Sequence, residues 1–395
     1  MRGSLLHSVK DMNALPVLLV TLGAATASEL EETGRSHLYN MEIAAARAVF
    51  SELDRKAPLS PAGPYYEATT LWMEEFSRRG GMAGATFRTG QYWSWKKIPP
   101  EAELDREFKR LIQQTISRAD AILKKEPLDL EGLFFRGSAE GLLGAYLASV
   151  EYSYYGAYQA GKRAKEYHER LLRIDPAYAD ACLLPGIFEY TIATLPRSLR
   201  ILGFVVGIKG SKEKGLSLVE RAVRGGERTR WVARLSLSVM QQREKRYLSS
   251  LAALRELETA FPRNPFLPME RGSVHLLRKD WAAARRAFEE VLTKRTERGQ
   301  GFELLEPALV FLRLGESRLF AKDPTGAARE LERALQTPGA PDWVRAQVFL
   351  RRGMTSDAQG LRLAAESDYR RVLRLDTDPQ TTRLAKQYLE GPFRN

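Results

Sequence analysis

One spacing recurs four times between Arg234 and Val372, and it constrains the fold more than any other feature of the chain. In each copy a small residue is followed twelve positions later by Ala or Ser, then four later by a bulky residue, then three later by an apolar one. The four copies are Ser238, Ser250, Leu254 and Leu257; Gly272, Ala284, Phe288 and Val291; Gly315, Ala327, Leu331 and Ala334; and Gly353, Ala365, Tyr369 and Val372. The two small residues let a pair of helices cross closely, and the bulky residue lies one turn further along the same face. One such pair cannot bury its own apolar stripe, so we expect the pairs to stack.

This spacing is typical of the tetratricopeptide helix–turn–helix pattern, whose period is about 34 residues. The four small crossing residues are 34, 43 and 38 positions apart, which predicts insertions around residues 295–306 and 322–324. We therefore predict an all-α, right-handed superhelical solenoid of tetratricopeptide-like hairpins, with regular repeats over residues 231–379. Residues 380–395 would form a closing helix, centred on 382–389, and a tail.

Residues 28–230 predict more divergent hairpins of the same kind. Gly34, Ala46, Phe50 and Leu53 keep the spacing, and Gly137 with Ala164 fits a pair lengthened by two turns in each helix. Further helices are predicted over residues 66–76, 101–125, 178–194 and 210–223. Residues 78–100, rich in Gly and aromatic residues, are too long for a turn between helices and predict an inserted loop.

The first 27 residues have the pattern of an export signal. Arg2 and Lys10 supply positive charge, and an apolar run spans residues 14–23. Ala25 and Ala27 then provide the small residues of a cleavage site. Asp11 is unusual in such a signal, and the alternative is a first helix that packs on the repeats. We therefore expect an exported, periplasmic or envelope-associated protein, with a cytoplasmic location as the alternative.

Positive charge is concentrated in one part of the chain. The net charge is +12, and residues 191–250 alone hold thirteen Lys or Arg against four Glu. The candidate basic surface consists of Arg197, Arg200, Lys209, Lys212 and Lys214, which surround an apolar stretch at residues 201–208. Such a surface would attract an acidic protein segment or an anionic membrane. The alternative is that the apolar stretch is buried and the charges only keep the chain soluble. Nucleic acid is the least expected partner, because export would separate the two.

The sequence offers no set of residues for catalysis. The single cysteine, Cys182, lies among apolar residues, and the four histidines are not in a metal-ligand spacing. The glycines at 80–84 lack the Lys-Ser/Thr ending of a phosphate-binding loop. The aromatic residues at 92–95 either grip a partner, lie at a membrane interface or cover the side of the solenoid. We therefore predict no catalytic, cofactor-binding or metal-binding residues.

First helices of tetratricopeptide pairs usually line the concave surface of the solenoid. In the register of this chain, six residues on those helices are expected to face inward and contact a partner: Gln242, Arg243, Ser273, Leu277, Glu316 and Phe320. A polar groove with a few apolar positions would accept an extended or helical peptide.

Residues 183–291 carry a more specific resemblance. The run Gly186-Ile187-Phe188-Glu189-Tyr190 is followed by Thr194-Leu195-Pro196, then by Leu199, Leu202-Gly203-Phe204, Gly210, Lys212, Gly215-Leu216 and Leu218. This pattern, which covers about a quarter of the chain, resembles the tetratricopeptide-repeat protein 39 and inclusion-body-clearance family. The resemblance implies a helical repeat fold without catalytic residues and, for some members, a link to lipid handling. A signal peptide departs from that family's pattern, so a shared cellular role does not follow.

Together these observations predict a non-catalytic scaffold that binds a protein or peptide. The alternative is a peripheral membrane or lipid-associated protein that uses the basic 191–250 region.

Overall fold

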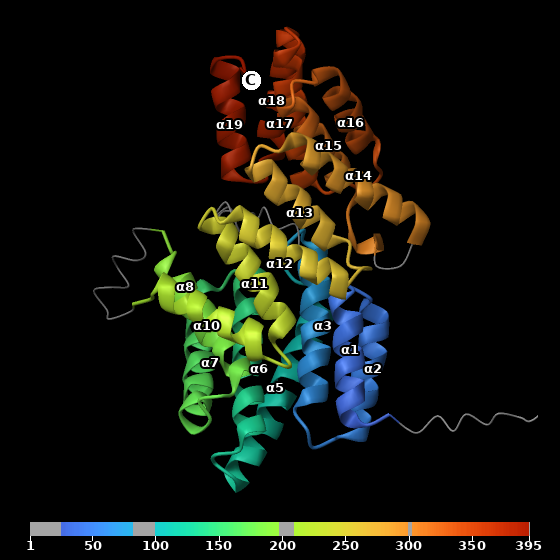
Figure 1. Cartoon of the computed structure of the whole chain (residues 1–395). Helices are drawn as coiled ribbons and strands as arrows, with labels where there is room; N and C mark the ends of the chain where they lie inside the picture. Colours follow the sequence, from blue (N-terminus) through green and yellow to red (C-terminus); the bar gives the residue numbers. More distant parts are fainter. Residues whose placement is uncertain (1–24, 82–98, 197–208, 299–301, 395) are drawn as a thin grey trace, which may run out of the picture.

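The computed structural model describes residues 25–81, 99–196, 209–298 and 302–394, and within them the chain folds into seventeen α-helices and two short 3-10 helices, without strands. The α-helices follow one another as antiparallel pairs (Figure 1). The pairs are α1 (Ala27–Tyr39) with α2 (Ile43–Lys56), α3 (Ala62–Arg78) with α5 (Ala102–Lys125), α6 (Leu130–Ser149) with α7 (Tyr154–Ile174), α8 (Leu183–Ala193) with α10 (Lys212–Gly225), α11 (Arg230–Arg243) with α12 (Tyr247–Ala260), α13 (Phe266–Leu277) with α14 (Trp281–Arg298), α15 (Pro307–Phe320) with α16 (Pro324–Gln336), and α17 (Asp342–Ala358) with α18 (Arg362–Leu375). The single helix α19 (Pro379–Glu390) follows them, and the 3-10 helices are η2 (Ala179–Cys182) and η3 (Phe302–Leu304).

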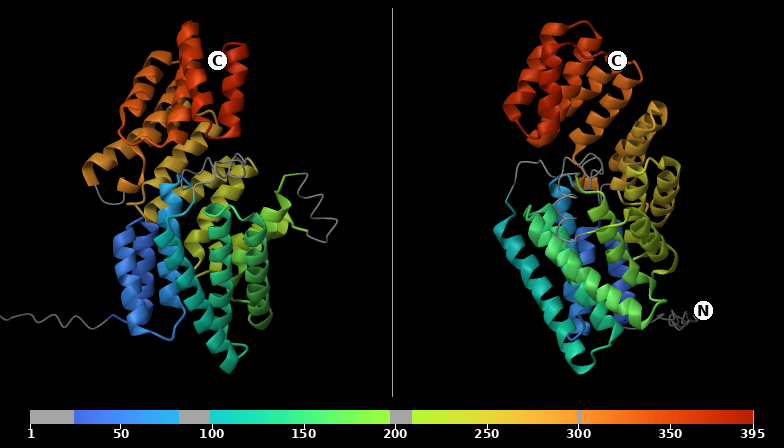
Figure 2. Two further views of the ribbon diagram at one scale, coloured as in Figure 1. Left: turned by 180° about the vertical axis from the view of Figure 1, so that it is seen from behind. Right: turned by 90° about the vertical axis from the view of Figure 1, so that its left-hand side faces the viewer.

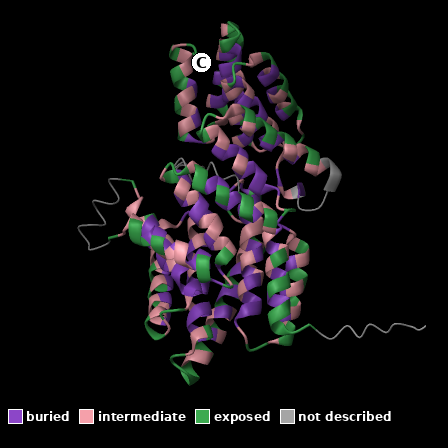
Figure 3. Ribbon diagram, in the orientation of Figure 1, coloured by how far each residue is buried: buried purple, intermediate pink, exposed green. Residues whose placement is uncertain are grey.

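The pairs stack into a superhelical solenoid, which confirms the predicted fold class. In Figures 1 and 2 the first pairs form the lower part of the molecule and α15–α19 form its upper end. Buried residues gather on the helix faces that meet neighbouring helices, and the exposed residues lie on the outer faces and in the turns (Figure 3).

The paired helices touch at the small residues that were predicted to lie at the helix crossings. A β-carbon on Gly272 would overlap the ring of Phe288, and one on Gly353 would overlap the ring of Tyr369. In the α11–α12 pair the two hydroxyls of Ser238 and Ser250 are hydrogen-bonded to each other at 2.8 Å. The repeat spacing therefore reports real interhelical contacts.

The turn between the two helices of a pair also repeats. In five pairs the residue seven positions after the crossing residue has a left-handed backbone: φ is 62° at Met41, 59° at Lys245, 60° at Lys279, 63° at Lys322 and 77° at Gly360. This conformation reverses the chain within a few residues. The expected insertion at residues 322–324 is wrong, because the turn before α16 has the same form as the others. The extra residues of that repeat lie in the longer α17, which begins eleven residues before Gly353, whereas α13 begins six residues before Gly272.

The lengthened pair predicted from Gly137 and Ala164 is present as α6 and α7, of 20 and 21 residues. His168, four residues after Ala164, takes the place that Phe288 and Tyr369 hold in other pairs, and its ring touches Gly137. The long pair therefore uses the same crossing with a histidine as the bulky residue.

The expected helix over residues 178–194 is divided into η2 and α8. Pro185 lies in the first turn of α8, where its missing N–H costs nothing. The Asp180 carboxylate accepts hydrogen bonds from the backbone N–H groups of Glu227 at 3.2 Å and Thr229 at 2.8 Å. This contact ties the divided segment to the turn before α11.

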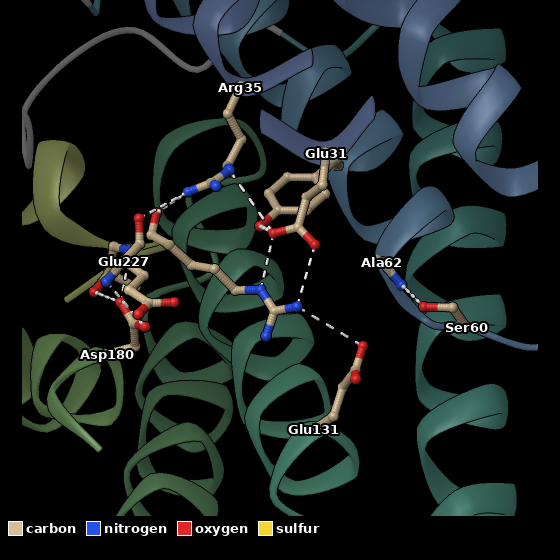
Figure 4. A network of polar contacts seen from close by, with 10 residues as sticks. Glu31, Arg35, Ser60, Ala62, Glu131, Asp180 and Glu227 are labelled. Carbon is tan, nitrogen blue, oxygen red and sulfur yellow. Dashed lines mark hydrogen bonds and ion pairs between the residues drawn. The ribbon is translucent and has the colours of Figure 1, made fainter. Parts of the chain in front are cut away.

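The first helix also packs against that turn, far along the sequence. Arg228 binds the Glu31 carboxylate of α1 through its Nε at 2.8 Å, and Arg35 donates to the Glu227 carbonyl at 3.0 Å (Figure 4). Further along, the Asn264 side chain donates to the Tyr39 carbonyl at 2.7 Å. The α1–α2 pair is therefore held against both ends of the α11–α12 pair, a closure that the repeat pattern does not predict.

Candidate partner-binding surface

The inner face of the C-terminal repeats is formed by their first helices. Helix α15 contacts α17 directly as well as its own partner α16, and α13 contacts α15. Neighbouring first helices approach one another in this way when a solenoid curves toward them. The six predicted partner-binding residues lie on first helices of three repeats: Gln242 and Arg243 on α11, Ser273 and Leu277 on α13, and Glu316 and Phe320 on α15.

Three of the six residues are buried. Gln242 is 3% exposed, and its amide donates to Glu270 Oε1 on α13 at 2.9 Å. The Ser273 hydroxyl donates to the Met269 carbonyl of its own helix at 3.0 Å. Glu316 is 7% exposed and lies between two arginines. Gln242 and Glu316 therefore join neighbouring helices, Ser273 is satisfied within its own helix, and these three polar groups do not form an open groove.

Glu316 is the centre of a charged cluster. It binds Arg313 on the same helix and Arg351 on α17, each at 2.7 Å. Burial alone would raise the pKa of Glu316, but Arg351 and Arg313 outweigh burial and lower the pKa to about 2. The carboxylate is therefore charged at every physiological pH and joins two repeats.

The other three residues share one position, five residues after the crossing residue of their repeat. Arg243 is exposed, with its guanidinium 5.7 Å from the centre of the Tyr190 ring. Leu277 is 41% exposed. Phe320 is half-buried, stacked on Trp281 with ring centres 5.4 Å apart. This position presents a cation, an aliphatic group and an aromatic ring along the ends of three first helices.

Sequence reasoning missed a second recurring position on the same face. Glu270, Arg313 and Arg351 each lie two residues before a crossing glycine. Glu270 binds Gln242 and Arg351 binds Glu316 across successive first helices, while Arg313 binds Glu316 within α15. The sequence does contain a sign of this position, because a charged residue occupies it in three repeats.

A small cavity lies beside this polar row. It is lined by Phe266, Met269, Glu270, Ser273, Leu305, Leu309 and Arg313. Its walls are mostly apolar, with a carboxylate and a guanidinium at its edge.

The predicted basic surface is largely paired with acidic groups where the structure describes it. Lys212 binds Glu244 at 2.7 Å and Lys214 binds Glu189 at 2.9 Å. Lys209 is exposed, while Arg197 and Arg200 lie outside the described residues. The two described ion pairs leave less free positive charge than the sequence indicates.

The structure also bears on the other features singled out from the sequence: the cysteine, the aromatic loop, the export signal, and metal-binding or membrane-spanning segments. Cys182 is fully buried, as expected of a packed small residue. Residues 1–24 of the expected export signal (1–27) lie outside the described residues. So do residues 82–98 of the predicted inserted loop (78–100), which include the aromatic residues at 92–95. Thr26, within the expected cleavage site, caps α1 with Glu29. Across the described ranges no group of three metal-ligating side chains occurs, and no helix there has the length and apolar character needed to cross a bilayer.

Comparison with known proteins supports the fold. No protein-family model and no curated protein sequence matches the chain. A chain in the Cut9–Hcn1 hetero-tetramer of APC/C is similar in structure, with a TM-score of 0.53 and 14% identity over 92% of this chain and 56% of that chain. PilF of Pseudomonas aeruginosa gives a TM-score of 0.41 with 17% identity, covering 64% of this chain and 96% of PilF. Yeast Tom70 gives 0.41 with 10% identity, covering 92% and 88%.

At these identities the similarity shows the fold alone. The chain is a tetratricopeptide-repeat solenoid by its repeats and by its structural neighbours. It spans little more than half the length of the Cut9–Hcn1 chain.

Proposed function

We propose that this protein is a non-catalytic scaffold that binds a peptide segment of another protein along the ends of its first helices. The main evidence for this proposal is the recurring position, five residues after the crossing residue, that Arg243, Leu277 and Phe320 occupy. On successive repeats Arg243 and Leu277 are exposed and Phe320 is half-buried, beside a row of buried polar contacts that keeps the helices in register. A rigid framework with exposed, varied side chains suits recognition of an extended segment. The Cut9–Hcn1 chain is part of a hetero-tetramer of APC/C by its name, which agrees with this role.

An acidic partner segment fits the charge of the chain best. The net charge is +12, and Arg243 is exposed at the edge of the basic 191–250 region. A membrane-associated role is less well supported, because Lys212 and Lys214 are already bound to carboxylates. Export to the periplasm or envelope, and kinship with the tetratricopeptide-repeat protein 39 and inclusion-body-clearance family, belong to the same proposal.

Site-specific photo-cross-linking tests the surface. A photoreactive amino acid at Arg243 or Leu277 should give discrete cross-linked products in cells. The same amino acid at Arg255 or Arg286, exposed residues on second helices, is the matched control. Products of equal yield from all four positions, or from the controls alone, would contradict the proposed surface.

A further inference from the structure

The C-terminal segment, residues 391–394, does not continue away from α19 but lies back against an earlier repeat. The Phe393 ring is 6.5 Å from the ring of Phe320 on α15 and 5.6 Å from the ring of Tyr388 on α19, edge to face in both cases. Phe320 and Phe393 are thus in contact although helices α17 and α18 lie between them in the sequence. Figure 1 shows the chain ending among these last helices.

A buried carboxylate holds the backbone of this segment. The Asp357 side chain is 0% exposed, and its Oδ2 accepts the Phe393 N–H at 2.8 Å. The same carboxylate accepts the Tyr369 hydroxyl at 2.8 Å and the Arg362 guanidinium at 3.1 Å. Arg362 also donates to the Leu389 carbonyl at 2.9 Å. The binding site for Phe393 therefore combines a fixed hydrogen-bond acceptor with an aromatic wall.

That wall is itself rigidly supported. Trp281 stacks on Phe320 at 5.4 Å, and the guanidinium of Arg351 lies 5.8 Å from the centre of the Phe320 ring. Arg351 is in turn bound to Glu316. An aromatic side chain that binds here would thus contact a preformed surface, and few protein side chains would have to become ordered on binding.

The segment lies on the face that the repeat register assigns to partner binding. Asp357 is four residues after Gly353, the position that Gln242 holds in its repeat, and Phe320 is five residues after Gly315, the position of Arg243 and Leu277. The segment thus makes, within one chain, the contacts expected of a bound peptide: an extended backbone, one N–H given to the protein and one aromatic anchor.

We propose that residues 391–394 are a displaceable internal occupant of a peptide-docking site built by Phe320, Trp281 and Asp357. Its external ligand is an extended segment of a partner protein that presents an aromatic side chain on a residue with a free N–H. The proposal rests on the scaffold function and specifies the chemistry of the partner. A segment joined to the protein by a short connection has an effective concentration on the order of millimolar, so it weakens the binding of any competitor until it is displaced.

A peptide with the sequence of residues 389–394, labelled with a fluorophore, tests the proposal without a natural partner. Binding is measured by fluorescence anisotropy to the full chain and to a chain shortened after Glu390. We expect the shortened chain to bind the peptide at least tenfold more tightly than the full chain. A peptide carrying Phe393→Ala should bind the shortened chain at least tenfold more weakly, and Phe320→Ala in the shortened chain should weaken binding similarly. A full chain with Phe393→Ala should bind the unchanged peptide better than the full chain does.

Several results would overturn the proposal. The peptide could fail to bind the shortened chain, or bind both chains equally. The shortened chain could lose its helical circular-dichroism signal, which would make the segment an essential part of the fold. Sedimentation could show that shortening dissolves a dimer of the full chain, which would assign the segment to a second copy. Because cross-linking from Arg243 and Leu277 concerns other repeats, either experiment can fail while the other succeeds.

Discussion

Gly272 lies flat against the ring of Phe288, so closely that a β-carbon on Gly272 would come within 3.0 Å of three ring atoms. Gly272→Ala should therefore force the two helices apart and destabilise the protein by about 1–3 kcal/mol in urea unfolding. Gly391→Ala is the matched control, because a β-carbon there meets nothing within 4 Å. If the contact is the cause, Phe288→Leu should recover part of the loss in the double variant.

A second prediction concerns the left-handed turns. Lys279 and Lys322 have φ of 60° and 63°, where glycine is favoured over residues with a β-carbon. Lys279→Gly and Lys322→Gly should each stabilise the protein by up to about 1 kcal/mol. Both changes are measured as shifts of the urea midpoint at constant slope.

Lys294→Gly, inside α14, provides the contrast for this prediction. There the same change should destabilise by about 1 kcal/mol, because the backbone is helical. A loss of stability at Lys279 comparable to that at Lys294 would show that the lysine side chain matters more than its backbone conformation.

The sequence could predict these features because they are local. A crossing residue such as Gly272 and its contact Phe288 are only 16 positions apart, and the pattern that relates them recurs in every regular repeat. Helix ends follow equally local signals, such as Asp378 capping α19 before Pro379. The succession of pairs and the closing helix could therefore be predicted.

The closure by α1 could not be predicted, because Glu31 and Arg228 are 197 residues apart and neither belongs to a repeating position. The burial of Gln242 was missed for a related reason. A polar residue on a first helix is compatible with an open groove, and only its partner Glu270 in the next repeat shows that it is a contact between helices. How the superhelix curves decides such contacts, and a single repeat does not encode that curvature.

The buried Glu316 carboxylate should make the stability of the fold depend on pH under acidic conditions. Arg351 and Arg313 overcome the effect of burial and lower its folded-state pKa to about 2, while the unfolded value is near 4.5. A lowered carboxyl pKa stabilises the fold above pH 4.5, and this contribution is lost as the pH falls from 4.5 toward 2. Glu316→Gln should cost about 3 kcal/mol at pH 7, since it leaves two arginines without their shared partner. It should also flatten the pH dependence of stability in that window.

Glu289→Gln provides the control for this prediction, because Glu289 is exposed and forms only peripheral ion pairs. Its effect should stay within about 0.5 kcal/mol. Unfolding free energies of the two variants at pH 7 and at acid pH decide the matter. Equal effects would mean that the buried cluster contributes no more than a surface pair.

The buried His168 should make stability depend on pH in a second range. Burial lowers the pKa of its ring to about 4, although the Phe134 carbonyl, 3.2 Å from Nε2, opposes the shift. The unfolded chain therefore binds a proton below about pH 6.5 that the folded chain does not, so stability should fall as the pH drops from 6.5 to 4. His168→Phe, which copies the residue used at Phe288, should remove most of this dependence.

The stability of His168→Phe at pH 7 should lie within about 1.5 kcal/mol of the parent, because a ring of similar size replaces the imidazole. Urea unfolding at pH 7, 5.5 and 4.5 gives the comparison. An unchanged slope of stability against pH between 6.5 and 4 would assign the effect to another group.

The ion pair that closes α1 onto the turn before α11 can be tested by removing its two members separately and together. Arg228→Met should destabilise by about 3 kcal/mol, because Glu31, itself only 7% exposed, would stay buried without its main counter-charge. Hydrogen exchange in α1 and α2 should rise more than in α17 and α18, since the loss falls on the closure.

Glu31→Leu combined with Arg228→Met should recover much of that stability, because apolar side chains of similar size can fill the site once neither charge is present. Arg224→Met is the matched control: Arg224 is 70% exposed and lies 4.0 Å from Glu220, so the change should cost less than about 0.5 kcal/mol. If the double variant is as unstable as Arg228→Met alone, hydrogen bonds from Arg228 and Tyr66 to Glu31, rather than charge balance, hold the first hairpin in place.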